Sequence, residues 1–264
     1  MANKKKTLLW SIQFPEAEKP SFLFGTMHVQ DKQAFTFIEK AYRTIELCDK
    51  IALEFDLDEV PQHIDPQLIR LPAGQTLDQL IRPKAFNKMR AQLLKSYQID
   101  LWQLRFFTPM FVSNTITSQL LAKDMPFALD EQLWLYAKQK GIPGFGIETY
   151  QEQLTILNRI PLDQQLKALV MMVKQISAYR KKIKRMAELY ATADIYQIYK
   201  SAKKSASGVR HLLLYDRNAI MAGRISQQAK MQAVFFAIGA GHLAGGKGVL
   251  RLLKHKGAKI RPVT

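Results

Sequence analysis

The sequence predicts an α/β fold: a mixed, mostly parallel sheet flanked by helices, with a large helical insertion that forms a cap. Short apolar segments alternate with amphipathic segments at both ends of the 264-residue chain, as strands joined by helices do. The middle of the chain, from about residue 76 to 140 and from 161 to 230, has almost wholly helical patterning. No Pro- or Ser-rich linker divides the chain, so we expect one domain over residues 1–264.

Six segments have the short, apolar or alternating pattern of strands and are bounded by Gly, Pro or charged turn residues. They are residues 8–14, 22–25, 51–55, 144–147, 234–238 and 259–263. The first two flank the turn segment 15–20 and predict a hairpin. Pro262 lies in the last segment and lacks a backbone donor, so we expect that strand at an edge of the sheet.

Helical periodicity fills most of the remaining chain. Thr76 opens a short helix, and Pro83 begins the next one because proline fits the first turn of a helix. The other predicted helices cover residues 35–47, 101–122, 130–140, 161–190, 194–203, 216–230 and 243–256. Asp216 is the predicted N-cap of the helix 216–230.

The chain is strongly basic, with 39 Lys and Arg against 22 Asp and Glu and a formal net charge of +17. Such a charge favours polyanions, including nucleic acid and anionic lipid headgroups. Basic residues gather at 180–185 and at 200–210, but neither stretch has zinc-finger spacing or an aromatic RNA-binding motif. Nucleic-acid binding is therefore an alternative, and a solvated helix face is the simpler interpretation.

Hydropathy and cysteine content indicate the compartment. No apolar run reaches the roughly 18 residues of a membrane-spanning helix, and the apolar stretch 7–12 is too short for the core of a signal peptide. We therefore expect a cytoplasmic protein. The single cysteine, Cys48, lies in an apolar helical segment, which predicts an inert buried thiol.

Four predicted strands lead directly into a residue that can bind a metal ion: His28, Glu54, Glu148 and His242. Ligands of α/β proteins bind beyond the carboxyl ends of the strands. Two imidazoles and two carboxylates at one edge of a sheet would form a nitrogen and oxygen site, which suits Zn, Mn, Co or Fe better than Ca or Mg. The sequence therefore predicts a transition-metal centre at this edge.

A glycine stands three residues before each of these two histidines, where the chain must leave a strand sharply. The spacing alone is weak evidence, because Gly208 and His211 have it too and follow a loop. Strand context alone separates His28 and His242 from that third example, and each of the two could instead be a structural hydrogen-bonding residue. The remaining histidines, His63, His211 and His255, lack the context and are expected at the surface or around the site.

The two glutamates and Arg217 are the candidate catalytic residues. A carboxylate at an apolar strand end must be paired, bound to metal or protonated. Glu54 or Glu148 could act as ligand or general base, and Glu148 could alternatively cap the following helix. Arg217 is expected in the first turn of a helix, where a cation is unfavourable, so it needs a partner: a developing oxyanion, or Asp216 or Glu148 in a structural pair.

By these residues the sequence resembles the TraB/GumN family, which includes the Tiki metalloproteases and is distantly similar to erythromycin esterases and haem-binding ChaN-like proteins. The shared motifs are residues 9–10 (LW), 24–28 (FGTMH), 52–58 (ALEFDLD), 129–130 (LD), 146–154 (GIETYQEQL), 216–221 (DRNAIM), 238–243 (IGAGHL) and 248–253 (GVLRLL). The family's paired Gly-x-x-His motifs fall on Gly25–His28 and Gly239–His242, and its acidic residue on Glu54. Its Gly-x-Glu-Thr segment falls on residues 146–149, and its Arg-Asn pair on 217–218.

The resemblance implies a metal-dependent hydrolase and, for the Tiki branch, a Mn- or Co-dependent peptidase that acts on extracellular proteins. We therefore predict a hydrolase of peptide or small-molecule substrates with Mn, Co or Zn bound by His28, His242 and Glu54. Glu148 would be the fourth ligand or the base, and Arg217 would stabilise the transition state. The alternative is a protein that binds haem or a peptide signal on the same fold without catalysis.

Overall fold

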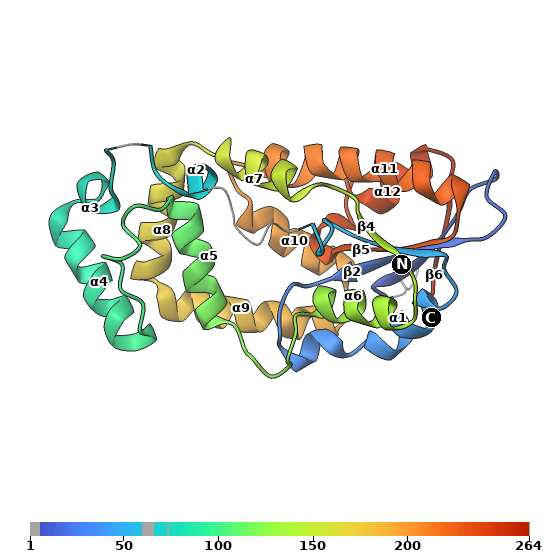
Figure 1. The fold of residues 1–264 in the computed structure, drawn as a ribbon, viewed down its shortest axis with the longest axis horizontal. Coiled ribbons are helices and arrows are strands. Elements are labelled where there is room, and N and C mark those ends of the chain that lie inside the picture. The colour runs from blue at the N-terminus through green and yellow to red at the C-terminus, as the bar shows by residue number, and fades with distance from the viewer. Residues whose placement is uncertain (1–5, 60–65, 73, 264) are drawn as a thin grey trace. The chain divides into compact units, whose positions relative to one another are not determined.

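The computed structural model describes residues 6–59, 66–72 and 74–263. Within them, six strands form one sheet in the order β4-β3-β5-β2-β1-β6 (Figure 1). The strands are β1 (Leu9–Gln13), β2 (Ser21–Thr26), β3 (Lys50–Leu53), β4 (Gly144–Gly146), β5 (Val234–Gly239) and β6 (Lys259–Pro262). All six predicted strands are confirmed, with ends that move by one or two residues.

The four strands β2, β5, β3 and β4 run parallel, so their carboxyl ends lie along one edge of the sheet, which we call the carboxyl edge. Thr26 pairs with Gly239 there, and Leu53 pairs with Gly146. β1 pairs antiparallel with β2, which confirms the hairpin, and β6 lies at the sheet edge as Pro262 requires. The sheet is therefore mixed and mostly parallel, as predicted.

Helices cover both faces of the sheet: Figure 1 shows α11 and α12 on one side and α1 and α6 on the other. The helical segments that belong to the same compact unit as the sheet are η1 (Lys32–Phe35), α1 (Ile38–Ile45), α6 (Leu129–Gln139), α10 (Ile195–Ser205), η2 (His211–Asp216), α11 (Arg217–Met231), η3 (Ala240–His242) and α12 (Val249–His255). Leu23, Ile51 and Phe235 are fully buried between the helical layers. Strands buried on both faces have continuous apolar sequences, which is why the central strands could be predicted from the sequence.

The chain divides into two compact units. The sheet unit holds Met1–Val60, Ala122–Gln153 and Arg185–Thr264, and the helical unit holds Pro61–Leu121 and Leu154–Lys184. The helical unit matches only part of the predicted helical insertion, because residues 122–140 and 185–230 belong to the sheet unit. The cap arrangement and the assignment of residues 1–264 to one domain stay predictions.

The helical unit has a hydrophobic core of its own, in which Leu77, Phe86, Val112 and Leu169 are buried. Its helices are α2 (Pro66–Ile69), α3 (Leu77–Leu80), α4 (Pro83–Tyr97), α5 (Pro109–Leu120) and α8 (Leu162–Lys174), while α7 (Tyr150–Asn158) and α9 (Ile176–Ala191) have residues in both units. Both predicted helix starts, after Thr76 and at Pro83, are confirmed.

Three predicted helices are wrong in extent. The segment 161–190 breaks at Gln175, which leaves the helical conformation with φ −115° and ψ 30°. The segment 101–122 is a helix only from Pro109, because Thr108 caps a new first turn there and proline cannot continue an existing one. Residues 243–248 form a loop, so the helix predicted over 243–256 shortens to α12. Apolar periodicity continues across such breaks and therefore does not reveal them.

Asp216 is not an N-cap, which corrects the prediction. It has helical φ and ψ angles and makes no capping hydrogen bond, because the π-helix η2 runs directly into α11. Arg217 therefore does not stand at a free helix terminus. A π-helix inserts an extra residue in a turn, and such turns are frequent at functional sites.

Over the described residues, every helix is too short or too polar to cross a lipid bilayer. Cys48 is buried, its thiol donates to the Thr44 carbonyl at 3.4 Å, and burial raises its pKa to about 12. The prediction of a buried thiol is confirmed.

We expect Cys48 to resist a disulfide exchange reagent in the native protein, because its reactive thiolate is scarce at about pH 8 and its sulfur is covered. The thiol should react fully once urea unfolds the chain. The absorbance of the thiolate that the reagent releases measures the rate of modification in the native and in the unfolded protein. A matched control is Leu47→Cys in a Cys48→Ala background, since the Leu47 side chain is 65% exposed and its replacement should react at once. Rapid modification of native Cys48 would contradict the buried position.

Candidate active site

Glu54 and Glu148 come together because the pairing of β3 with β4 continues one step past the strands. Ile147 N–H donates to the Leu53 carbonyl at 2.8 Å, and Glu148 N–H donates to the Glu54 carbonyl at 2.7 Å. Both glutamates therefore leave the carboxyl edge at the same level. Their side chains are mostly buried, with 22% of Glu54 and 1% of Glu148 exposed.

Arg217 neutralises this carboxylate pair. Its Nη2 lies 2.6 Å from Glu54 Oε2 and 2.5 Å from Glu148 Oε2, and its Nε donates to Glu148 Oε1 at 3.2 Å. The guanidinium is itself 14% exposed. Burial opposes its charge, but the two carboxylates outweigh burial and raise the pKa of Arg217 above its ordinary value. The partners of Arg217 are thus Glu148, which was one expectation, and Glu54, which was not.

Two further donors hold the carboxylates. Gln153, on α7, donates from its Nε2 to Glu54 Oε2 and to Glu148 Oε2, each at 3.3 Å. Gly239 N–H, at the end of β5, donates to Glu54 Oε1 at 2.7 Å. Burial alone would raise the pKa of Glu54, yet His242, Arg217 and the Gly239 N–H outweigh it and hold that pKa at about 2. Glu54 is therefore ionised at neutral pH.

His242 stands next to Glu54, on the other side of Gly239. A Cβ added to Gly239 would lie 3.1 Å from Glu54 Oε1 and 3.5 Å from Cδ2 of the His242 ring. His242 is buried, and burial lowers its pKa to about 4, with Arg217 adding to the effect and Glu54 opposing it. At neutral pH the imidazole is uncharged beside an ionised carboxylate.

Asn218 determines which ring nitrogen of His242 carries the proton. The Asn218 Nδ2 donates to the Lys247 carbonyl at 2.7 Å, which orients its Oδ1 toward His242 Nδ1 at 2.6 Å. Only a protonated Nδ1 can donate to that oxygen, so the lone pair of the neutral ring is on Nε2. Nε2 is the nitrogen available to a metal ion or to a proton.

The hydrogen-bond partner of His28 is Asp130 and not one of the two glutamates. Its Nδ1 is 3.2 Å from Asp130 Oδ2, and its side chain is 65% exposed. The hydrogen bond to Asp130 raises the pKa of His28 against burial, and the charges of Glu131 and Glu54 add to the rise. His28 is therefore within electrostatic range of Glu54, although its hydrogen bond goes to Asp130.

Gly25, the first residue of the N-terminal Gly-x-x-His motif, has to be glycine for a steric reason. A Cβ there would lie 2.6 Å from Leu243 Cδ1 and 3.1 Å from the Cβ of Ala240, so only glycine lets β2 pass this closely to η3. The Tyr190 hydroxyl donates to the Gly25 carbonyl at 2.6 Å, in a buried position. This close packing joins the two Gly-x-x-His motifs of the chain.

The predicted metal ligands are not assembled as a ligand group. Across the described part of the chain, no three His, Cys, Asp or Glu side chains converge closely enough to hold a metal ion. Arg217 bonds to both carboxylates, and Asp130 bonds to His28. In type, two imidazoles and two carboxylates match a transition metal. The assignment of His28, Glu54, Glu148 and His242 as metal ligands stays a prediction.

Three residues that hold the site were not assigned a role from the sequence: Gln153, Asp130 and Asn218. The only signal was their place inside the short motifs shared with the family. The capping alternative for Glu148 is wrong, because Thr149 and Glu152 cap α7 instead. Glu152 N–H donates to Thr149 Oγ1 at 3.1 Å, and Thr149 N–H donates to Glu152 Oε2 at 2.7 Å.

The other histidines lie away from the carboxylates. His211 is exposed and packs edge-on against Tyr215 at 5.0 Å, and His255 is exposed at the end of α12. His63 lies outside the described residues.

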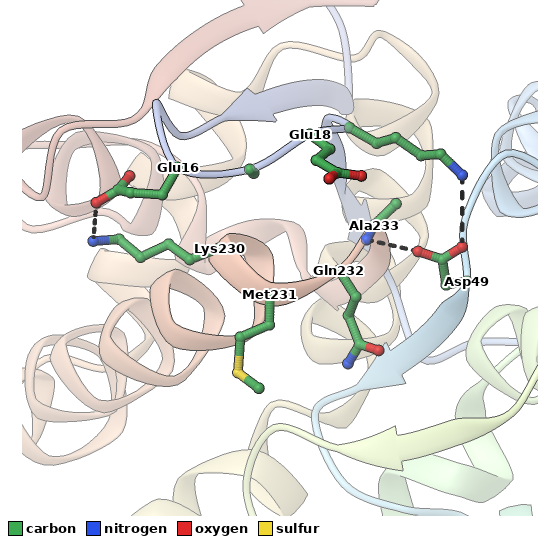
Figure 2. A pocket seen from close by; sticks show the side chains of 9 residues that line it. Glu16, Glu18, Asp49, Lys230, Met231, Gln232 and Ala233 are labelled. Carbon is green, nitrogen blue, oxygen red and sulfur yellow. Dashed lines mark hydrogen bonds and ion pairs between the residues drawn. The ribbon is translucent and has the colours of Figure 1, made fainter.

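A separate cavity of about 340 Å³ lies at the opposite edge of the sheet, where β3 and β5 begin. Figure 2 shows Lys230 directed at Glu16 and the Ala233 backbone directed at Asp49. These contacts measure 2.8 Å and 3.0 Å. The cavity is lined by satisfied ion pairs and hydrogen bonds and holds none of the predicted site residues.

Comparison with known proteins agrees with these motifs. The chain belongs to the TraB/PrgY/gumN family, whose sequence pattern matches residues 8–262. Metalloprotease TIKI2 of Danio rerio is 24% identical over 96% of this chain and 60% of its own length. Metalloprotease TIKI1 of Danio rerio is 22% identical over 96% of this chain and 62% of its own length.

A Metalloprotease TIKI homolog of Nematostella vectensis is 21% identical over 97% of this chain and 67% of its own length. The chain spans about 60% of the length of the two Danio relatives. No solved structure gives a significant match. The predicted family and the α/β fold are confirmed.

We expect Arg217→Met to destabilise the protein by on the order of 3 kcal/mol, because it leaves two buried carboxylates without their cation. Urea unfolding followed by circular dichroism measures the change. The matched control is Lys230→Met, which removes a cation from the exposed pair with Glu16 and should leave the free energy of unfolding close to the wild-type value. Equal stability of Arg217→Met and wild type would show that the ion pair does not support the fold.

Proposed function

We propose that this protein is a metal-dependent hydrolase of the Tiki type that cleaves peptide bonds in the cytosol. The observation that carries the proposal is the buried Glu54–Arg217–Glu148 cluster beside neutral His242 at the carboxyl edge. Similarity to metalloproteases over 96% of the chain supports the reaction class. Charged groups that are buried and paired beyond parallel strand ends are typical of catalytic centres.

The two glutamates differ in burial, which supports different roles. Glu148 is 1% exposed and both of its oxygens bond to Arg217, so in the proposal it positions the guanidinium in addition to its role as fourth metal ligand. Glu54 retains 22% exposure, and Gly239 N–H fixes its Oε1. In the proposal Glu54 is the carboxylate that meets the reacting groups, as metal ligand or as general base.

Arg217 and His242 complete the proposed chemistry. The guanidinium is permanently charged and is already fixed by two carboxylates, so it can stabilise negative charge on a scissile carbonyl without reorganisation. His242 offers Nε2 as an acceptor, because Asn218 engages Nδ1. These two groups approach the same carboxylate, Glu54, from different elements.

A divalent transition metal, Mn, Co or Zn, is the proposed cofactor, and its proposed ligands are His28, His242, Glu54 and Glu148. The donor types fit such an ion, and the names of the relatives support it. When bound, the ion supplies Lewis acidity for the scissile carbonyl. Since Arg217 holds the carboxylates, an ion has to compete with the guanidinium for them.

We expect the purified protein to hydrolyse an unstructured peptide, with activity that depends on added Mn, Co or Zn. Glu54→Gln should lower kcat/KM by about 100-fold or more, because it removes the accessible carboxylate. His242→Ala should lower both the activity and the metal content. Peptide cleavage followed by mass spectrometry, together with elemental analysis, measures these effects.

The matched control is Glu152→Gln, which neutralises another glutamate of the same region, one that pairs with Arg224 and with the Thr149 N–H at the start of α7. It should retain wild-type activity. Hydrolysis that is equal in wild type and Glu54→Gln would refute the proposed centre. Haem uptake with a Soret band, without hydrolysis, would favour the binding alternative instead.

Asn218 is a positioning residue in this proposal. Asn218→Ala should lower kcat about 10- to 100-fold with a smaller effect on KM, because His242 loses the hydrogen bond that fixes its tautomer. Nitrogen NMR of the His242 ring should show mixed Nδ1 and Nε2 protonation in the variant and a single tautomer in the wild type.

Ile220→Ala is the control for Asn218, since Ile220 lies on the same helix with 42% of its surface exposed. Its kinetics and its His242 spectrum should match the wild type. A single unchanged His242 tautomer in Asn218→Ala would argue against the positioning role even if activity fell.

A further inference from the structure

Three cations converge on Tyr215, beside the candidate centre, and the proposed chemistry does not use them. Lys247 Nζ lies 4.8 Å from the centre of the Tyr215 ring. Arg210 precedes Tyr215 by five residues, about one turn of the π-helix η2, and the charges of Arg210 and Lys203 lower the pKa of Tyr215. We call Lys203, Arg210, Lys247 and Tyr215 the Tyr215 cluster. Lys203, Arg210 and Tyr215 are half-buried and Lys247 is exposed.

The fold builds this cluster by packing α10 against η3 and the loop that follows His242. A Cβ on Gly241 would lie 2.9 Å from the Ala202 Cβ, and a Cβ on Gly245 would lie 2.4 Å from the Tyr199 ring. Gly245 also has φ +96°, which favours glycine. Tyr199 and Lys203 are four residues apart on α10 and therefore share one helix face. That face presents both of them to Tyr215.

The Tyr215 hydroxyl lies in a positively charged environment. Tyr199, Lys203 and Arg210 together hold the pKa of Tyr215 below its ordinary value, against burial. A protonated tyrosine hydroxyl has one hydrogen that it can donate. A hydroxyl among three cations is suited to an anionic oxygen.

No carboxylate of the described residues forms an ion pair with Lys203, Arg210 or Lys247. The centre next to them differs, because Arg217 there is matched by two carboxylates. Three like charges gathered around one side chain repel one another, and an external anion relieves that repulsion.

The cluster is joined directly to the candidate centre. Asn218 bonds to the Lys247 carbonyl through its Nδ2 and to His242 through its Oδ1. Tyr215 precedes Arg217 by two residues where η2 passes into α11. A group bound at the cluster is therefore adjacent to the residues proposed to act on the substrate.

We propose that the Tyr215 cluster is a subsite for a carboxylate of the substrate, which gives the enzyme a preference for acidic peptides. This inference rests on the proposed function, because it names the substrate class of the same site. A peptide side chain of Asp or Glu, or a C-terminal carboxylate, supplies the anionic oxygens.

A peptide carboxylate fits the cluster better than a nucleic acid does. Binding of single strands depends on open aromatic faces on which bases stack. Lys247 covers a face of the Tyr215 ring, and the His211 ring packs edge-on against the same residue at 5.0 Å. The cluster presents charge and a hydroxyl donor rather than a stacking surface.

Binding is tested with two peptides whose termini are blocked and uncharged: acetyl-Ala-Glu-Ala-Glu-Ala-amide and its counterpart with Gln in place of Glu. Calorimetry with the full-length Glu54→Gln variant at physiological ionic strength measures affinity without turnover. We expect the acidic peptide to bind about tenfold more tightly, as charge-assisted hydrogen bonds imply. Lys203→Gln/Arg210→Gln/Lys247→Gln should abolish the difference.

The control is Lys84→Gln/Lys88→Gln/Lys95→Gln on α4, which removes the same net charge from exposed positions of the helical unit and should keep the preference. Equal binding of the two peptides, or a preference that survives in the first triple variant, overturns the subsite. So does a short oligothymidylate that binds more tightly than the acidic peptide through the same three cations. Because binding is measured without hydrolysis, an inactive wild type would refute the proposed function and leave this result standing.

Discussion

The site depends on one electrostatic constraint: two carboxylates leave adjacent parallel strands at the same level. The backbone pairing that extends β3 and β4 fixes Glu54 and Glu148 side by side, where their charges repel. Arg217 removes that conflict, with contacts of 2.6 Å and 2.5 Å to the two side chains. The strand register and the position of α11 are therefore linked by one cation.

Neutralisation by Arg217 also sets the state of the neighbouring imidazole. With one guanidinium for two carboxylates, the cluster retains a net negative charge, which by itself would favour a charged His242. Burial is the stronger influence and lowers the pKa of His242 to about 4. An ionised acid thus stands beside a neutral imidazole whose free nitrogen is Nε2. Chemistry that uses a lone pair and a negative charge together is available at neutral pH.

The sequence predicted the carboxyl-edge residues because strand ends are readable from apolar runs and turn residues. Glu54 and Glu148 were placed correctly by that rule alone. Their partner was harder to predict, since Arg217 is separated from them by 163 and 69 residues and its direction depends on the face of α11. Asp130 beside His28 has the same difficulty. Apolar periodicity is also insensitive to one extra residue, which is why neither η2 nor the break at Gln175 was predicted.

The unpredicted π-helix accounts for much of the local organisation. Tyr215, Arg217 and Asn218 are nearly consecutive, yet their side chains contact three different groups. Tyr215 contacts Lys247 in the Tyr215 cluster, Arg217 binds the carboxylate pair, and Asn218 bonds to the His242 ring. In a regular α-helix successive residues diverge by about 100°, and the wider π turn lets η2 enter α11 without a free N-terminus. Because no capping group is needed there, the first residues of α11 are free to use their side chains for the site. A chain break at this junction would have required a capping group at Asp216, directly before the residue that reaches both glutamates.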